Sequence, residues 1–183
     1  MLWPFNRFRT QGAPSRGTIE AIYGMIVAQA REPVFYAGMN VPDTVDGRFD
    51  MVLLHLWMVL RHLRKGDNGD SLSQELFDRF CEDMDANLRE MGVGDLTVPK
   101  RMQAFGEAFY GRTAAYDLAL AGGEDDLAEA IGRNVLNGNN PDSARSLARY
   151  VMATVDALAS TDAAALAGGA WRFPQPATAS RAS

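Results

Sequence analysis

The sequence has only one cysteine, Cys81, so the chain cannot form a disulfide bond within itself. It is also short of basic residues: 18 lysines and arginines stand against 23 aspartates and glutamates, a formal net charge of −5. Proteins that bind nucleic acid usually present a dense basic surface. These two shortages argue against a disulfide-linked secreted scaffold and against nucleic acid as a partner.

Long apolar runs are missing as well. The longest uncharged apolar stretch within an expected helix covers residues 51–60, about half of the ~20 residues that a membrane-spanning helix needs. A second, alanine-rich stretch at 151–171 is long enough, but Asp156 and Asp162 interrupt it. We therefore expect both stretches to form helices in the core of a folded domain.

The alternating pattern of β-strands is nearly absent, which predicts an all-α fold. Apolar residues recur at helical spacing between glycines and prolines, and 47% hydrophobic residues are enough for a folded core. We predict a single-domain helical bundle of about six helices with short extra helical turns. The expected helices cover residues 17–31, 43–65, 70–91, 97–121, 124–136 and 141–159, with a short helical turn at 34–38. Asp43 is the expected N-cap of the second helix and Thr161 that of a last short piece.

Two tails are expected to flank a helical domain at residues 17–173. The N-terminal tail, residues 1–16, carries three arginines and no acid. It lacks the apolar run and cleavage site of a secretory signal, so we interpret it as flexible, basic and aromatic. The alternative is a weak contact of its aromatic rings and arginines with an anionic membrane. Residues 174–183 have no large apolar side chain and are expected to be disordered.

The expected helix at 97–121 has three distinct faces. Arg101 and Arg112 are eleven positions apart, so they return to nearly the same helical angle, at the edge of a wide apolar face. That apolar face consists of Val98, Met102, Phe105, Phe109, Tyr116 and Leu120. A strip of small residues that would allow close approach of another helix consists of Ala104, Ala108, Gly111 and Ala115.

Two interpretations of this helix remain open, and they can coexist. In the first it is the central helix of the bundle, covered on most sides. In the second, Arg101, Arg112 and Tyr110 border a groove for an apolar, partly folded polypeptide, in which apolar burial supplies most of the affinity.

The histidines and acidic residues do not predict a cofactor or a metal site. His55 and His62 are seven residues apart on one expected helix, so they cannot approach one haem iron from opposite sides, and there is no C-x-x-C-H motif. We interpret both as partly buried. The carboxylates between residues 75 and 85 are interpreted as a solvated helix face, the alternative being a docking surface for a basic partner.

A catalytic nucleophile is not predicted either. Cys81 follows Phe80 in an expected core helix and has no histidine nearby in the sequence. The GVGD stretch at residues 92–95 lacks the remaining residues of a phosphate-binding loop and reads as a tight turn between helices. The alternative is that backbone N–H groups at this turn receive a carboxylate.

One segment carries a resemblance to a known family. The run LREMGVGDLTVPKRM, which starts at Leu88, and the later AFYGR resemble the signature of the ubiquinol–cytochrome c reductase assembly chaperone family. The resemblance extends over residues 17–136 and is densest at 77–116, with Asn134 and Val135 at a weaker position.

This resemblance implies a non-catalytic chaperone that binds newly made cytochrome b and assists assembly of the cytochrome bc1 complex of the respiratory chain. We expect no cofactor. The residues that match the family motif, and that are therefore expected on the client-binding side, are Asp95, Lys100, Arg101, Met102, Phe109, Tyr110 and Arg112.

The sequence departs from the mitochondrial members of that family, which have an import presequence and a longer N-terminal region. We therefore expect a bacterial member in the cytoplasm, with peripheral contact to the inner face of the inner membrane as an alternative location. Mitochondrial members work with a small partner protein, and the sequence leaves open whether one exists here. Two rival functions are a peripheral lipid-binding protein, whose groove receives an acyl chain, and an enzyme that uses Arg101 and Arg112 as an anion pocket.

Overall fold

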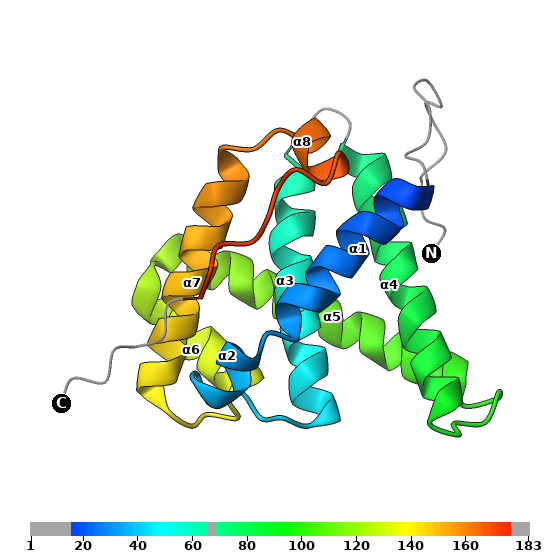
Figure 1. Cartoon of the computed structure of the whole chain (residues 1–183). Helices are drawn as coiled ribbons and strands as arrows, with labels where there is room; N and C mark the ends of the chain where they lie inside the picture. Colours follow the sequence, from blue (N-terminus) through cyan, green and yellow to red (C-terminus); the bar gives the residue numbers. More distant parts are fainter. Residues whose placement is uncertain (1–15, 66–68, 177–183) are drawn as a thin grey trace.

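The computed structural model describes residues 16–65 and 69–176, and this part of the chain is built from helices and connecting loops (Figure 1). The all-α prediction is confirmed. The helices are α1 (Arg16–Ala30), α2 (Pro33–Ala37), α3 (Val45–Leu63), α4 (Gly69–Glu90), α5 (Val98–Gly122), α6 (Glu124–Val135), α7 (Pro141–Ala159) and α8 (Ala163–Ala167). The six long helices correspond to the six predicted from the sequence, and α2 and α8 are short extra turns of five residues each.

Two predicted helix caps are wrong by one residue. The side chain of Thr44 accepts a hydrogen bond from the backbone N–H of Gly47, so Thr44 is the N-cap of α3. Asp43 instead forms an ion pair with Arg48, 2.6 Å between Oδ1 and Nε. At α8 the N-cap is Asp162 and not Thr161. The Asp162 carboxylate accepts a hydrogen bond of 2.6 Å from the backbone N–H of Ala165.

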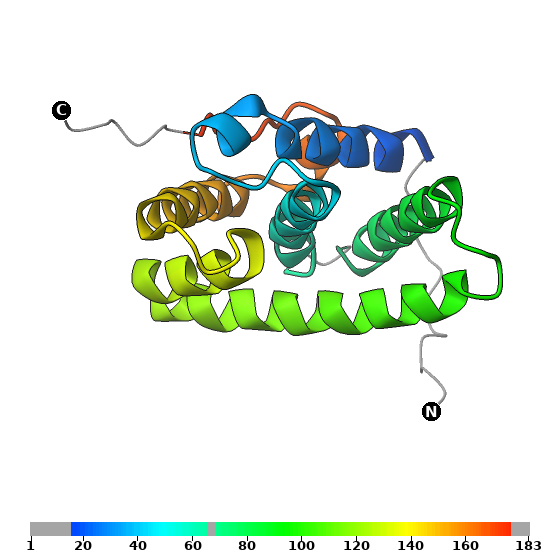
Figure 2. The ribbon, with the colours of Figure 1, turned by 90° about the horizontal axis from the view of Figure 1, so that it is seen from below.

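Helix α3 is the central element of the bundle. All ten residues from 51 to 60 are buried, and α3 packs against α1, α4, α6 and α7. Figure 2 shows α5 lying along one side of the bundle, below α3 and α4, with α1 on the opposite side. The interpretation of the helix at 97–121 as the central one is therefore wrong, because α3 occupies that place.

The apolar stretch at 51–60 thus forms core, as expected. No helix within residues 16–65 and 69–176 is long and apolar enough to cross a membrane. The alanine-rich stretch at 151–171 is divided between α7, α8 and the loops around them.

A non-helical segment after α8 completes the core. Trp171 and Phe173 are buried, and the Phe173 ring lies edge-on to His55 of α3, with 5.1 Å between ring centroids. The expected helical domain at 17–173 includes this segment. The predictions for the two tails fall mostly on residues 1–15 and 177–183, which lie outside the described residues.

Candidate functional site

An open groove of about 770 Å³ lies where four helices converge: the second half of α1, the start of α3, the end of α4 and the start of α5. We call it the four-helix groove. Because α1 and α5 lie on opposite sides of the α3–α4 pair (Figure 2), they form two opposite walls of this groove. Its apolar lining residues are Val27, Val45, Phe49, Val52, Met84, Leu88, Met91, Met102 and Phe105.

The apolar lining is partly open to solvent and adaptable in shape. Val45 is 70% exposed and Met91 is 60% exposed, which is unusual for large apolar side chains. Met84, Met91 and Met102 contribute flexible thioether side chains, which can repack around ligands of different shape. The groove therefore suits an apolar ligand of variable contour.

Some charged side chains of the groove are bonded to neighbouring residues, and others are exposed to solvent. Asp83 is engaged within the wall, because it accepts a hydrogen bond of 2.8 Å from the Tyr23 hydroxyl and lies 3.8 Å from Arg79. Burial, together with this bond to a carboxylate, raises the pKa of Tyr23. By contrast, Asp46, Arg31 and Arg101 line the groove and are exposed.

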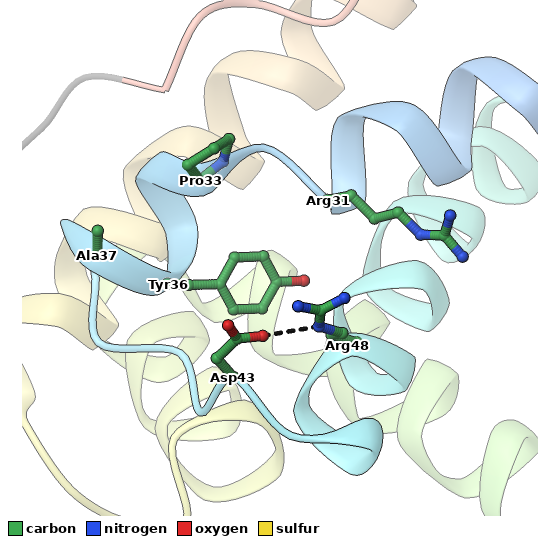
Figure 3. Close-up of a pocket in the computed structure, with 6 residues that line it drawn as sticks. All are labelled: Arg31, Pro33, Tyr36, Ala37, Asp43 and Arg48. Carbon is green, nitrogen blue, oxygen red and sulfur yellow. Dashed lines mark hydrogen bonds and ion pairs between the residues drawn. The ribbon is translucent and has the colours of Figure 1, made fainter.

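A smaller pocket of about 420 Å³ adjoins the groove and shares Arg31 and Arg48 with it (Figure 3). In this pocket the Arg48 guanidinium binds Asp43 and lies 5.9 Å from the centre of the Tyr36 ring. The hydrogen bond from Arg48 lowers the pKa of Asp43. The Tyr36 hydroxyl donates to the carbonyl of Ala30 at 2.7 Å, which anchors α2 to the end of α1.

Of the residues expected on the client-binding side, Arg101 and Met102 line the four-helix groove. Lys100 is exposed next to them at the start of α5. Asp95 is also exposed, in the loop before α5, and it forms an ion pair with Arg89. These four residues lie at or just before the start of α5, the end of the helix that lines the groove.

The other three expected residues do not line the groove. Phe109 is fully buried between aromatic rings, with centroids 4.9 Å from Phe77 and 6.1 Å from Phe80. Its expected role as a client contact is therefore corrected: its side chain forms part of the protein interior. Tyr110 is exposed and lies beside Phe77, with 6.1 Å between ring centroids. Arg112 forms an ion pair with Asp50 of α3 and so belongs to the α3–α5 junction.

Most of the strip of small residues on α5 is open to solvent. Ala104, Ala108 and Gly111 are exposed, and a Cβ atom added to Gly111 would have no neighbour within 4 Å. Leu118, on the same helix, is 78% exposed. The expectation of close helix approach is therefore wrong at these three residues, whereas Ala115, the fourth residue of the strip, is half-buried.

The two histidines lie apart from the groove. His55 is fully buried: its Nδ1 atom donates to the carbonyl of Met51 at 2.7 Å, and the Tyr150 hydroxyl donates to its Nε2 atom at 2.9 Å. Burial lowers the pKa of His55 to about 4, so the ring is neutral at pH 7. No group of three potential metal-ligating residues occurs within residues 16–65 and 69–176.

Sequence reasoning missed the half of the groove that comes from α1 and α3. Arg31 follows the last residue of α1, and Arg48 lies in the first turns of α3, where polar residues are common. Val45 is the first residue of α3 and has no unusual feature in the sequence. Met84 and Leu88 of α4 have half-buried side chains that line the groove. Nothing in the spacing of these residues marks them as one surface.

Comparison with known proteins gives related chains over most of the described residues. The sequence model of a family described as ubiquinol-cytochrome C chaperone matches residues 37–173. The ubiquinol-cytochrome-c reductase complex assembly factor 1 of Xenopus laevis is 29% identical over 131 residues, which are 70% of this chain and 66% of that protein. The mitochondrial protein CBP3 of Saccharomyces cerevisiae is 28% identical over 149 residues, 78% of this chain and 44% of that protein.

A solved structure is also similar. The crystal structure of the Cbp3 homolog from Brucella abortus superposes with a TM-score of 0.80 at 39% sequence identity, and the match covers 88% of this chain and 91% of that chain. This chain spans less than two thirds of the length of the two curated relatives above.

Proposed function

The chain belongs to the ubiquinol–cytochrome c chaperone family, and we propose that it assists assembly of the cytochrome bc1 complex by binding newly made cytochrome b in the four-helix groove. A chaperone of this kind acts by binding, without covalent chemistry. Its place of action is the cytoplasm or the inner face of the inner membrane, where a membrane protein such as cytochrome b is inserted.

The observation that carries this proposal is the apolar, partly exposed lining of the four-helix groove. Newly made segments of a membrane protein are apolar and lack their final partners, so burial in such a groove would shield them from water. Residues Lys100, Arg101 and Met102, which carry the family motif, lie at this groove and not at the smaller pocket near Tyr36. The motif and the groove therefore support the same surface.

The helix-in-groove mode fits this geometry. An amphipathic or apolar helix lays one face into a hydrophobic groove and is recognised at positions about one helical turn apart. The groove is open to solvent, and Val45 and Met91 are exposed apolar residues of its lining. Binding of a helical segment would bury these two exposed side chains.

The test introduces a carboxylate at the opening of the groove. Val45→Asp and Met91→Asp both change exposed side chains, so the protein is expected to fold as before. Each variant is expected to reduce co-purification of cytochrome b with the tagged protein and to lower the spectroscopic cytochrome b content of cells that depend on it. Leu118→Asp, at an equally exposed leucine outside the groove, is the matched control.

If Val45→Asp and Met91→Asp retain wild-type capture of cytochrome b while Leu118→Asp abolishes it, the client surface lies on the outer face of α5 and not in the groove. If the wild-type protein captures no cytochrome b, the proposed client is wrong.

A further inference from the structure

Two of the three arginines that line the four-helix groove have no acidic partner among the described residues, whereas the third, Arg48, is paired with Asp43. Eight arginines of the described chain form ion pairs with aspartate or glutamate. Arg31 and Arg101 both line the groove, and neither forms an ion pair with any residue in the described ranges. Two cations are therefore available at the groove for a ligand, together with one carboxylate, Asp46 of α3, which also lines the groove, is exposed and forms no ion pair with the described residues.

These two cations come from different walls. Arg31 follows the last residue of α1, and Arg101 lies in the first turn of α5. The two helices lie on opposite sides of the α3–α4 pair (Figure 2), and both arginines line the groove together with its apolar residues. A ligand that occupies the groove would meet apolar contacts and positive charges that come from two separate helices.

We infer that the groove accepts an amphipathic helical polypeptide segment whose apolar stripe is bordered by carboxylates, which pair with Arg31 on one side and Arg101 on the other. This inference rests on the proposed function, since it specifies the chemistry of the client segment that the groove binds. It assigns the apolar lining to affinity and the two arginines to selection among apolar segments.

The position of the arginines favours a helix over a lipid. A phosphate headgroup is a single compact anion, and its binding is strongest where several donors converge on one point. Arg31 follows α1 and Arg101 lies in the first turn of α5, and these two helices lie on opposite sides of the α3–α4 pair (Figure 2). A helix that lies in the groove has two flanks, one toward each wall, and its side chains three and four positions apart can place carboxylates on either flank.

The experiment uses fluorescence anisotropy with the full chain and three synthetic helical peptides. The peptides share one apolar stripe and carry glutamate, glutamine or lysine at its borders. The glutamate peptide is expected to bind about tenfold more tightly than the glutamine peptide at low ionic strength and to lose part of this preference as salt is added. The lysine peptide is expected to bind most weakly.

Substitutions then assign the preference to its residues. Arg31→Ala and Arg101→Ala are each expected to weaken binding of the glutamate peptide about two- to fivefold, the range of an exposed ion pair, and to leave the glutamine peptide unchanged. Arg64→Ala removes another exposed arginine that forms no ion pair with the described residues and does not line the groove. It is the matched control and should not alter binding of either peptide.

Equal affinity for the glutamate and glutamine peptides, or no binding of any peptide, would overturn the inference. Binding of vesicles of anionic phospholipid that is lost in Arg31→Ala and Arg101→Ala, without binding of the peptides, would assign the arginines to lipid instead. Capture of cytochrome b, measured with Met91→Asp and Leu118→Asp, tests the proposed function separately. If cytochrome b is still captured but the glutamate peptide is not preferred, the inference fails while the proposed function stands.

Discussion

Arg112 on α5 forms an ion pair with Asp50 on α3, and the pair joins the helix that borders the groove to the central helix of the bundle. The Asp50 side chain is only 12% exposed. Burial raises the pKa of Asp50, and the Arg112 guanidinium acts in the opposite direction. Arg112 therefore holds a partly buried carboxylate in its charged form.

Removal of Arg112 is expected to destabilise the fold and not only to alter binding. Arg112→Ala leaves the Asp50 carboxylate without its charged partner and should lower the free energy of unfolding by about 1–3 kcal/mol. The pKa of Asp50 is already raised, and loss of Arg112 raises it further, so the deficit should shrink as the pH falls toward the range in which Asp50 takes up a proton. Urea denaturation at pH 7 and at pH 4–5 measures both effects, and a deficit that is independent of pH would contradict this account.

Arg101→Ala is expected to behave differently from Arg112→Ala. Arg101 is exposed and has no ion-pair partner among the described residues, so its removal should change the free energy of unfolding by less than about 0.5 kcal/mol. Capture of cytochrome b should nevertheless decrease. The comparison of the two variants separates a binding role from a structural one, and an equally destabilised Arg101→Ala would remove that distinction.

Phe109 should be among the most sensitive positions of α5. Its side chain is fully buried among aromatic rings, so Phe109→Ala should lower the free energy of unfolding by about 3–5 kcal/mol. Leu118→Ala, one of the exposed apolar positions on the same helix, should cost less than about 0.5 kcal/mol. Chemical denaturation of both variants gives the comparison, and similar values for the two would mean that Phe109 is not core.

The buried His55 predicts a loss of stability in acid. The unfolded chain binds a proton on this histidine below pH 6.5, whereas the folded chain does so only near its pKa of about 4. Stability should therefore decrease between pH 6.5 and pH 4, by up to about 1.4 kcal/mol per pH unit. His55→Gln should flatten this dependence, while His62→Gln, at a partly exposed site, should retain most of it. Urea denaturation across this pH range measures the slopes.

Two glycines should respond oppositely to alanine. A Cβ atom at Gly47 would lie 2.0 Å from the backbone oxygen of Pro42, so Gly47→Ala forces the backbone apart and should cost about 1–3 kcal/mol. Gly111 lies inside α5 with open space around it, so Gly111→Ala should stabilise the protein by about 0.5–1 kcal/mol. Thermal unfolding of the two variants tests both, and destabilisation by Gly111→Ala would indicate that something packs on this face.

Most helices could be predicted from the sequence because their signals are local. Glycines and prolines mark the ends, and the apolar period of 3.6 residues marks the buried side, so the predicted 141–159 helix coincides with α7. The sequence alone does not identify the N-cap of α3, because Asp43 and Thr44 are both good capping residues. Only the contact of Thr44 with Gly47 and the ion pair of Asp43 with Arg48 distinguish them.

The groove could be predicted only in part, because it is made by helices that are far apart in the sequence. Helical angles placed Phe109 and Arg112 near the same sector of α5, but they cannot say which neighbour covers that sector. In the fold, Phe109 turns into the interior, and Arg112 meets Asp50. Arg31 reaches the same groove as Arg101 through the crossing of α1 over α3 and α4, which no local pattern encodes.

The late position of Trp171 and Phe173 in the chain has a consequence for biosynthesis. Phe173 covers His55, in the middle of the buried ten-residue stretch of α3. While the protein is being translated, α3 has left the ribosome long before these two aromatic residues. Its ten-residue apolar stretch must therefore wait for more than a hundred further residues before its last cover arrives, and during that interval the nascent protein itself exposes the kind of surface that chaperones recognise.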